Sequence, residues 1–302
     1  MANSQLPTFN SQLPTIIDGR KVSKEIKQEI TEKVQTLKEE DKRAPHLAII
    51  IVGDDGASHT YVNGKINACK EVGFDYTLMH FARTISEEKL IKHIEQLNED
   101  EDIDGFIVQI PLPEHISVEH ITERISPLKD VDGFTNQNFG SIMSNNQLLL
   151  PATPFGVMEL IRRYNIPIEG KRCVVVGASR IAGAPLSLMM LQDGGATVTV
   201  CHKLTENLSS HTKEADILIT AVGKPGLITK DMVKEGVVVI DIGTTRVEDA
   251  SRKSGFRLSG DVVYDEVAPV SSYITPVPGG VGPMTIASLL LNTLKAYEAN
   301  HA

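Results

Sequence analysis

Cysteine is scarce in this sequence, with three residues among 302. Cys69, Cys173 and Cys201 are odd in number and far apart, and no CxxC or histidine-rich spacing accompanies them. This pattern argues against a disulfide framework and against a structural zinc site, and it favours a reducing compartment. We therefore predict a cytoplasmic protein without a bound metal.

Long apolar runs are missing as well. The longest uninterrupted runs, such as residues 47–52, have the length of a strand, whereas a membrane-spanning helix needs about 20 apolar residues. The N-terminus has neither the charged-then-apolar pattern of a secretory signal nor the arginine-rich composition of an organelle presequence. The sequence thus predicts no membrane segment.

Basic charge is in deficit, and the formal net charge is −9. Nucleic acids and anionic membranes both require a net basic face, so the charge argues against either partner. An acidic small molecule can still bind through a local basic pocket. The content of 41% hydrophobic and 23% charged residues is that of a globular protein.

What the sequence does contain is a regular alternation of apolar strands and amphipathic helices. The first alternation consists of predicted helices at residues 21–42, 58–72 and 86–98 and strands at 47–52 and 105–110. After a loop-rich stretch at 130–154, a second has strands at 173–176, 197–201, 217–221 and 237–242 and helices at 182–192 and 207–214. Such alternation predicts βαβ units and a mostly parallel sheet.

We predict an α/β fold of two domains with a cleft between them. Residues 1–16, which hold a short polar repeat, form a flexible tail. Residues 17–150 form an N-terminal α/β domain, and a C-terminal helix at 283–302 joins it. Residues 151–282 form a Rossmann-type domain with a doubly wound parallel sheet.

A glycine-containing turn opens the second domain. Residues 177–183, Gly-Ala-Ser-Arg-Ile-Ala-Gly, join a buried strand to a helix. Glycine allows close backbone approach, and the helix N-terminus offers free N–H groups to a pyrophosphate. The Gly-x5-Gly spacing differs from the Rossmann GxGxxG and also suits a plain tight turn. Its place after the first strand of the domain favours a nucleotide site.

The end of the next strand bears on the choice of cofactor. NAD-specific folds place an acid there, on the ribose 2′-hydroxyl, but this strand ends in Cys201, His202 and Lys203. Lys203 and Arg180 can pair with a 2′-phosphate, which an acid would repel. The residues therefore favour NADP over NAD, unless both side chains are solvated surface charges.

Two places in the first domain combine reactive side chains. Tyr61 and Lys65 are four residues apart and share one face of a predicted helix. They imitate the Tyr-x-x-x-Lys of short-chain dehydrogenases, but in those enzymes the pair follows the nucleotide turn, whereas here it precedes it. We reject that assignment. Gln109 lies at the carboxyl end of a strand, where α/β sheets bind ligands.

Two loops complete the set of motifs. Residues 127–134, Pro-Leu-Lys-Asp-Val-Asp-Gly-Phe, carry two acids. Residues 275–285, Thr-Pro-Val-Pro-Gly-Gly-Val-Gly-Pro-Met-Thr, form a stiff loop with few side chains. Such a loop suits either close approach to a ligand or a domain connection.

In this order, the motifs closely resemble the bifunctional methylenetetrahydrofolate dehydrogenase/methenyltetrahydrofolate cyclohydrolase family. The resemblance rests on Val52-Gly53 with Ser58, Tyr61 and Lys65, on Val-Gln-Ile-Pro-Leu-Pro, on Lys-Asp-Val-Asp-Gly and on Pro-Gly-Gly-Val-Gly-Pro-Met-Thr, and it spans residues 15–298. It implies oxidation of 5,10-methylenetetrahydrofolate with NADP and hydrolysis of the methenyl product to 10-formyltetrahydrofolate. These reactions belong to one-carbon metabolism and purine biosynthesis, and members are typically homodimers.

The resemblance also implies roles for single residues. Lys65 would be the catalytic base or acid, with Gln109 bonded to it, while Tyr61 would pack on the pterin and Asp132 would hold its aminopyrimidine edge. Substrate contacts would come from Pro278, Gly282 and Thr285, and cofactor contacts from Gly177, Ala178, Ser179 and Thr244.

Some positions depart from the family pattern. Ala178 stands where many members have arginine, and Lys203 follows His202 where many have serine, so the cofactor stays open between NADP and NAD. Gly64 costs its helix roughly 1 kcal/mol relative to alanine and could loosen Lys65.

Three other functions are alternatives to this bifunctional enzyme. They are a monofunctional methylenetetrahydrofolate dehydrogenase, a dehydrogenase of a small hydroxy or amino acid, and a folate- or nucleotide-binding protein without catalysis. No motif supplies the base and the carboxylate-binding cation that a hydroxy-acid or amino-acid enzyme needs. Lys65, Gln109 and Asp132 argue against a protein that only binds.

Overall fold

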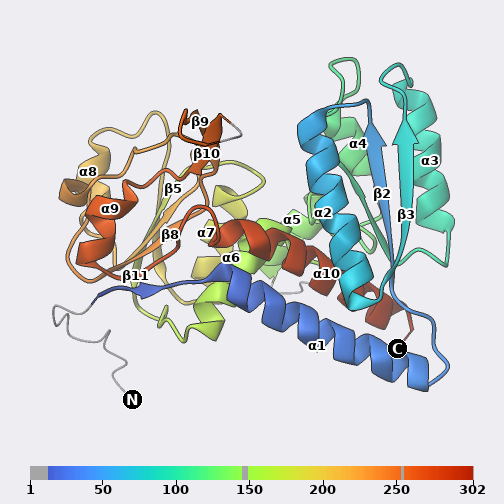
Figure 1. The fold of residues 1–302 in the computed structure, drawn as a ribbon, viewed down its shortest axis with the longest axis horizontal. Coiled ribbons are helices and arrows are strands. Elements are labelled where there is room, and N and C mark those ends of the chain that lie inside the picture. Colours follow the sequence, from blue (N-terminus) through green and yellow to red (C-terminus); the bar gives the residue numbers. More distant parts are fainter. Residues whose placement is uncertain (1–12, 145–148, 253–254, 302) are drawn as a thin grey trace. The chain divides into compact units, whose positions relative to one another are not determined.

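The computed structural model describes residues 13–144, 149–252 and 255–301 and divides into two compact units (Figure 1). We call them the six-stranded unit, Met1–Val22 with Thr153–Thr285, and the three-stranded unit, Ser23–Ala152 with Ile286–Ala302. Each unit has its own parallel sheet. No helix of the described residues is long and apolar enough to cross a bilayer.

The sheet of the six-stranded unit is parallel throughout. It consists of β1 (Thr15–Ile16), β5 (Arg172–Val176), β6 (Thr197–Cys201), β7 (Ile217–Thr220), β8 (Val237–Asp241) and β11 (Ser271–Ile274), in the order β1-β11-β8-β7-β5-β6. A short antiparallel pair, β9 (Thr245–Glu248) and β10 (Phe256–Ser259), stands apart from it.

Both faces of this sheet are buried. Val174 and Leu218 pack in a core with residues of α8 (Leu208–Thr212) and α9 (Tyr264–Val267). Their neighbours Val175 and Ile219 point to the opposite face and are fully buried as well. Burial on two faces explains why these strands are continuous apolar runs, and it confirms the predicted doubly wound parallel sheet.

Helix α7 (Gly183–Gln192), which contacts β5 and β6, and helix α8 begin and end within two residues of the predicted positions. Helix α6 (Ala152–Arg163) and the 3₁₀ turns η1 (Lys230–Met232) and η2 (Ala268–Val270) were not predicted. Helix α10 (Val281–Asn300) starts two residues earlier than the predicted helix at 283–302. Pro283 fits in its first turn because the N–H that proline lacks has no helical partner there.

The three-stranded unit has the parallel order β3-β2-β4. Its elements are α1 (Gly19–Glu39), β2 (His46–Val52), α2 (Gly56–Val72), β3 (Asp75–Phe81), α3 (Glu87–Glu99), β4 (Gly105–Val108), α4 (Val118–Arg124) and α5 (Asn136–Ser144). Ala48, Ile50 and Val52 pack against Leu90 and Ile94 of α3. The predicted apolar stripe of α1, Val22, Ile26, Ile30 and Val34, is buried.

The structure differs from the predictions in several other places. Residues 15–16, assigned to the tail, pair as β1 with β11, whereas the polar repeat lies mostly outside the described residues. Strand β3 was not predicted, because as an edge strand it exposes alternate side chains. Helix α5 and the first three residues of α6 lie in the stretch at 130–154 that was predicted as loop. The strand predicted at 105–110 ends at Val108, just before two prolines that cannot donate to a sheet.

Candidate active site

Helix α2 carries two of the predicted site residues. Its N-terminus is capped by Asp55, whose carboxylate accepts hydrogen bonds from the backbone N–H and the hydroxyl of Ser58, both at 2.8 Å. Four residues apart on this helix, Tyr61 is 59% exposed, whereas Lys65 is 8% exposed. The tyrosine thus offers its ring to solvent, while the lysine is held within the unit.

Lys65 and Gln109 are in direct contact. Lys65 Nζ donates to Gln109 Oε1 at 3.2 Å, and Gln109 Nε2 donates to the carbonyl oxygen of Ile110 at 2.7 Å. The backbone N–H of Gln109 is fixed by Ile50 of the neighbouring strand at 2.8 Å. Gln109 lies at the carboxyl end of β4, so its amide is positioned by the sheet and turned toward the amine.

The two acids of the loop after β4 have different partners. Asp130 is buried and accepts hydrogen bonds from the N–H groups of Gly133 and Thr135 and from the side-chain amide of Asn138, at 2.8–3.0 Å. The Asp132 carboxylate accepts none from the part of the chain that the structure describes, whereas the backbone carbonyl of Asp132 accepts one from the N–H of Ala152 at 3.2 Å. Asp130 therefore shapes the loop, and Asp132 is left available to a ligand.

Burial raises the pKa of the Asp132 carboxyl above its usual value. The positive charge of Lys65 opposes this increase, and the negative charge of Asp130 adds to it. Lys65 and Asp132 therefore lie close enough to interact electrostatically. The three-stranded unit thus brings together an amine, an amide and a carboxylate.

Helix α10 holds this loop in place from behind. The Asn292 side chain is fully buried and donates to the carbonyl oxygens of Val131, at 2.8 Å, and Leu150, at 2.7 Å. Gly64, which precedes Lys65, lies inside α2 without interrupting it. A β-carbon on Gly64 would meet only the Ile286 side chain, at an ordinary contact distance of 3.5 Å. Crowding therefore does not require a glycine at this position.

In the six-stranded unit, the glycine turn follows β5. Gly177 has φ of 116°, a conformation that favours glycine, and a β-carbon there would overlap the carbonyl oxygen of Ala221. A β-carbon on Gly183 would overlap the carbonyl oxygen of Gly177. The two glycines therefore let α7 begin directly against the turn, as the spacing predicted.

A cleft of about 610 Å³ opens beside this turn. Its lining includes Gly177, Ala178, Ser179 and Lys203, together with His202, Val222 and Lys224. Among the described residues, Arg180 and Thr244 do not line it. A cleft of this size at the carboxyl ends of parallel strands, with backbone at one wall and cations at another, fits a dinucleotide.

Sequence reasoning missed one residue that shapes this cleft. Asp261 is fully buried and accepts hydrogen bonds from the backbone N–H groups of Val222, at 2.8 Å, and Lys224, at 2.7 Å. It thereby fixes the loop after β7 that lines the cleft. No local motif marks Asp261, because its partners are nearly forty residues away.

The loop at 275–285 also belongs to the six-stranded unit. Gly279 has φ of 115° and accepts a hydrogen bond from the N–H of Arg20, and Gly280 donates to the carbonyl oxygen of Pro276 at 2.8 Å. Thr285 is bonded to Thr153 through their hydroxyls at 3.1 Å. Pro278 lies on this constrained loop, whereas Gly282 and Thr285 lie at the start of α10. The roles predicted for Pro278, Gly282 and Thr285 stay predictions.

One unit has a parallel sheet with a glycine turn and a cleft that fits a dinucleotide, and the other has a lysine, an amide and a carboxylate. Together they define the class of two-domain nicotinamide-dependent enzymes. Residues 17–132 match the catalytic domain of tetrahydrofolate dehydrogenase/cyclohydrolase, and residues 151–301 match the NAD(P)-binding domain of the same family. The chain belongs to the tetrahydrofolate dehydrogenase/cyclohydrolase family.

Individual relatives agree with this assignment. The chain is 54% identical over 284 residues to the bifunctional protein FolD of Cytophaga hutchinsonii, covering 93% of this chain and 98% of that protein. It is similar to the crystal structure of the bifunctional FolD enzyme of Campylobacter jejuni, with a TM-score of 0.90, 46% identity, and coverage of 94% and 99%. The Trypanosoma brucei FolD structure, in complex with NADP and an inhibitor, gives a TM-score of 0.90, 39% identity, and coverage of 95% and 98%.

These matches confirm the predicted family and the predicted two activities. The protein is an oxidoreductase and a hydrolase that acts on one-carbon units carried by tetrahydrofolate. Neither a dehydrogenase of hydroxy or amino acids nor a protein that only binds fits this family.

Proposed function

We propose that Lys65 transfers the proton in the hydrolysis of 5,10-methenyltetrahydrofolate and that Gln109 and Asp132 orient the amine and the folate. The observation that carries this proposal is the buried Lys65 amine, which Gln109 holds at 3.2 Å while the Asp132 carboxylate interacts with its charge. A positioned amine is suited to general acid–base work.

The oxidation step needs little from the protein's own acids and bases. The carbon that loses hydride lies between two folate nitrogens, whose lone pairs stabilise the methenyl cation. The nicotinamide cofactor, when bound, accepts the hydride. Tyr61, with its exposed ring on α2, would pack on the pterin and orient that carbon. Asp132 would accept two parallel N–H bonds from the aminopyrimidine edge.

Hydrolysis needs a proton to be moved. Water adds through its oxygen to the methenyl carbon, and Lys65 Nζ, in its uncharged form, accepts a proton from it. As the bond between this carbon and one folate nitrogen breaks, that nitrogen receives one of the two water protons, and the other is released. The neutral amide of Gln109 orients the amine without the additional negative charge of a carboxylate.

We propose that the cofactor is NADP. The backbone N–H groups of the turn around Gly177 would face the pyrophosphate, and the lack of a side chain at Gly177 lets this turn pack directly against the Ala221 backbone. Lys203 lines the cleft and would pair with a 2′-phosphate, and the relative from Trypanosoma brucei was crystallised with NADP. Arg180, Thr244, Pro278, Gly282 and Thr285 are further proposed contacts to cofactor or folate.

We also propose that the protein is a cytoplasmic homodimer. The three cysteines are buried and free, which suits a reducing compartment. The homodimer rests on the family resemblance, and sedimentation equilibrium of the purified protein measures it directly.

Replacement of Lys65 by methionine tests the central proposal. We expect Lys65→Met to lower the rate of methenyltetrahydrofolate hydrolysis by about 10²–10⁴-fold, the usual contribution of a general acid or base. The control is Lys70→Met, which removes a lysine in the last turn of the same helix. Hydrolysis by Lys65→Met at the rate of the control would exclude the role of Lys65.

A further inference from the structure

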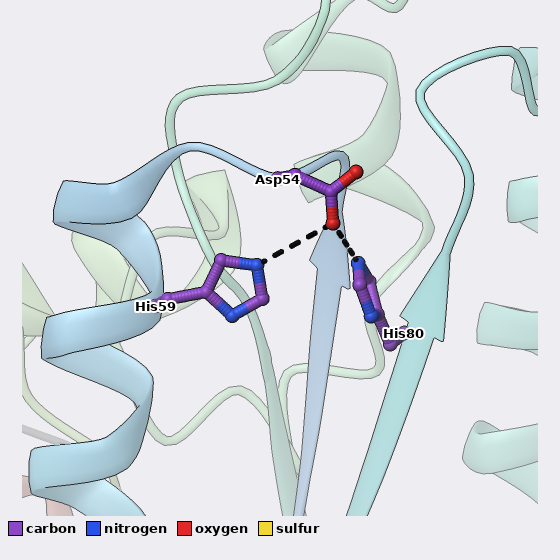
Figure 2. Close-up of side chains that lie close together, drawn as sticks. All are labelled: Asp54, His59 and His80. Atoms are coloured by element: carbon purple, nitrogen blue, oxygen red, sulfur yellow. Dashed lines mark ion pairs between the residues drawn. The ribbon is translucent and has the colours of Figure 1, made fainter.

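A second group of reactive side chains lies at the start of α2, whereas Lys65 is in the middle of this helix. Asp54 follows β2, His59 is in the first turns of α2, and His80 is near the end of β3. Figure 2 shows the two imidazoles turned toward the Asp54 carboxylate. His59 precedes Lys65 by six residues, or about 9 Å of helix rise, so this group is separate from the lysine site.

The distances in this group are those of metal ligands. His80 Nε2 lies 3.3 Å and His59 Nε2 lies 3.7 Å from the same oxygen, Asp54 Oδ1. One donor atom from each of the three side chains lies within 4.8 Å of the others. In a tetrahedral zinc site with bonds of about 2.0–2.1 Å, neighbouring ligand atoms are roughly 3.3–3.4 Å apart. Shifts of a few tenths of an ångström to about 1.5 Å would therefore bring the three atoms around one ion.

The local backbone sets up this arrangement. Gly53 turns the chain with φ of 82°, and its N–H donates to the carbonyl oxygen of Phe81 at 2.9 Å, which fixes the loop against β3. Asp55 is occupied by capping α2, so Asp54 is the acid of this loop that faces the histidines. The Gly53 carbonyl oxygen lies 3.1 Å from His80 Nε2 and is a fourth donor atom at the same place.

The chemistry of these donors selects the ligand. Two imidazole nitrogens and one carboxylate oxygen suit first-row divalent ions, above all zinc. The side chains of His59, His80 and Asp54 are 38%, 42% and 85% exposed, so an ion can enter and keep a water ligand. We propose that Asp54, His59 and His80 bind one zinc ion or a similar first-row divalent cation, which links the start of α2 to the end of β3.

Zinc binding by the full-length protein tests this site. The protein is stripped with a chelator and titrated with zinc by calorimetry, and with cobalt(II) as a visible-absorption probe of tetrahedral coordination. We expect one ion per chain, and at least a tenfold weaker affinity in His59→Gln and in His80→Gln. The matched control is His115→Gln, which removes an exposed histidine bonded to the Ile85 carbonyl outside the group. Its affinity should equal that of the unaltered protein.

Two results would overturn the site. One is the absence of stoichiometric zinc binding by the stripped protein. The other is equal affinity in His80→Gln, His59→Gln and the His115→Gln control, which would locate any bound zinc elsewhere. Both histidines are partly exposed, so the variants should fold, and circular dichroism checks this. A second supporting result would be that zinc raises the melting temperature of the unaltered protein and of the His115→Gln control but not that of His59→Gln or His80→Gln.

Discussion

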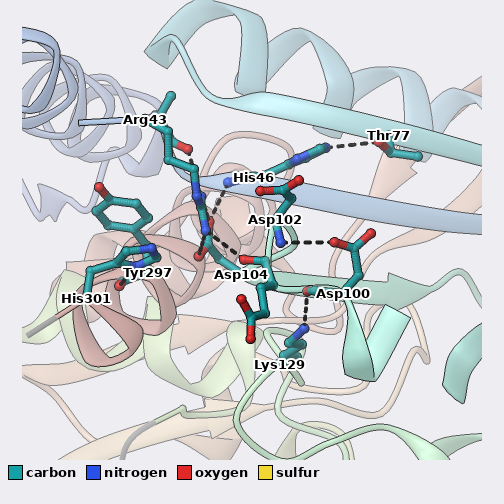
Figure 3. Close-up of polar contacts among 11 residues, drawn as sticks. Arg43, His46, Thr77, Asp100, Asp102, Asp104, Lys129, Tyr297 and His301 are labelled. Atoms are coloured by element: carbon teal, nitrogen blue, oxygen red, sulfur yellow. Dashed lines mark hydrogen bonds and ion pairs between the residues drawn. The ribbon is translucent and has the colours of Figure 1, made fainter. Parts of the chain in front are cut away.

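The two ends of the three-stranded sheet treat polar side chains in opposite ways. At the amino end, before β2 and β4, Arg43 donates two hydrogen bonds to Asp104, at 2.7 and 2.8 Å, and Asp104 is fully buried (Figure 3). The same carboxylate accepts the N–H of His46 at 2.8 Å, and the Arg43 guanidinium lies over the Tyr297 ring. Lys129 is similarly occupied by two backbone carbonyl oxygens.

At the carboxyl end, the polar side chains are held in place, but they keep hydrogen-bonding capacity that no neighbouring group of the described chain uses. Lys65 donates to Gln109, and the Asp132 carboxylate accepts no hydrogen bond from the described residues, although burial raises its pKa. A buried polar group without a partner costs stability, so such groups are kept where a ligand supplies the partner. The contrast indicates that the amino end stabilises the fold and that the carboxyl end binds and reacts, as is general for parallel sheets.

The largest expected effect is a loss of stability at the amino end of the sheet, where the polar side chains are hydrogen-bonded to one another. We expect Asp104→Ala to lower the free energy of unfolding by about 3–5 kcal/mol, because it leaves the Arg43 guanidinium without its charge partner. The control Asp102→Ala removes an exposed acid two residues away and should change stability little. Urea unfolding measures both. Folded Asp104→Ala should retain its hydrolysis rate, and a large loss of rate without a loss of stability would contradict the division between the two ends.

A smaller effect is expected at the carboxyl end. Gln109→Leu keeps the approximate size of the side chain but removes the oxygen that orients Lys65. We expect hydrolysis to fall at least tenfold, which corresponds to about 1.4 kcal/mol in the barrier, with a change in stability below that of Asp104→Ala. Gln96→Leu, on an exposed face of α3, is the control. An unchanged hydrolysis rate in Gln109→Leu would mean that the contact does not position the amine.

The sequence predicted the α/β class and most helices and strands. It could not predict how deeply single side chains are buried or which residues far apart in the sequence are in contact. Spacing placed Tyr61 and Lys65 on one helix face, yet only the fold makes one exposed and the other buried. The contact of Lys65 with Gln109 joins residues 44 apart, and it was expected from the family resemblance and not from any spacing. The Asp54–His59–His80 group was not predicted, because His80 lies on the edge strand β3, and this strand, with its exposed side chains, was itself not predicted.

The smallest and most diagnostic effect is the pH dependence of Asp132. Its pKa is raised in the folded protein, so between the ordinary value of 3.8 and the raised value the folded chain binds more protons than the unfolded one. The contribution of Asp132 to stability therefore increases as pH falls through this window and is lost as pH rises through it. The proposed folate contact needs the charged carboxylate, so the KM for folate should rise as pH falls through the same window.

Asp132→Asn separates these opposed effects. Lys65 and Asp130 are the charged groups that act on this carboxyl, and both remain in the variant. Its KM should be higher at neutral pH and vary less with pH, and the pH slope of its unfolding free energy should be less negative in this window. Profiles of KM and of urea unfolding, measured side by side with the unaltered protein, test both. Parallel KM profiles would show that another group, in the protein or in the folate, titrates instead, and Asp132 would then be a structural acid like Asp130.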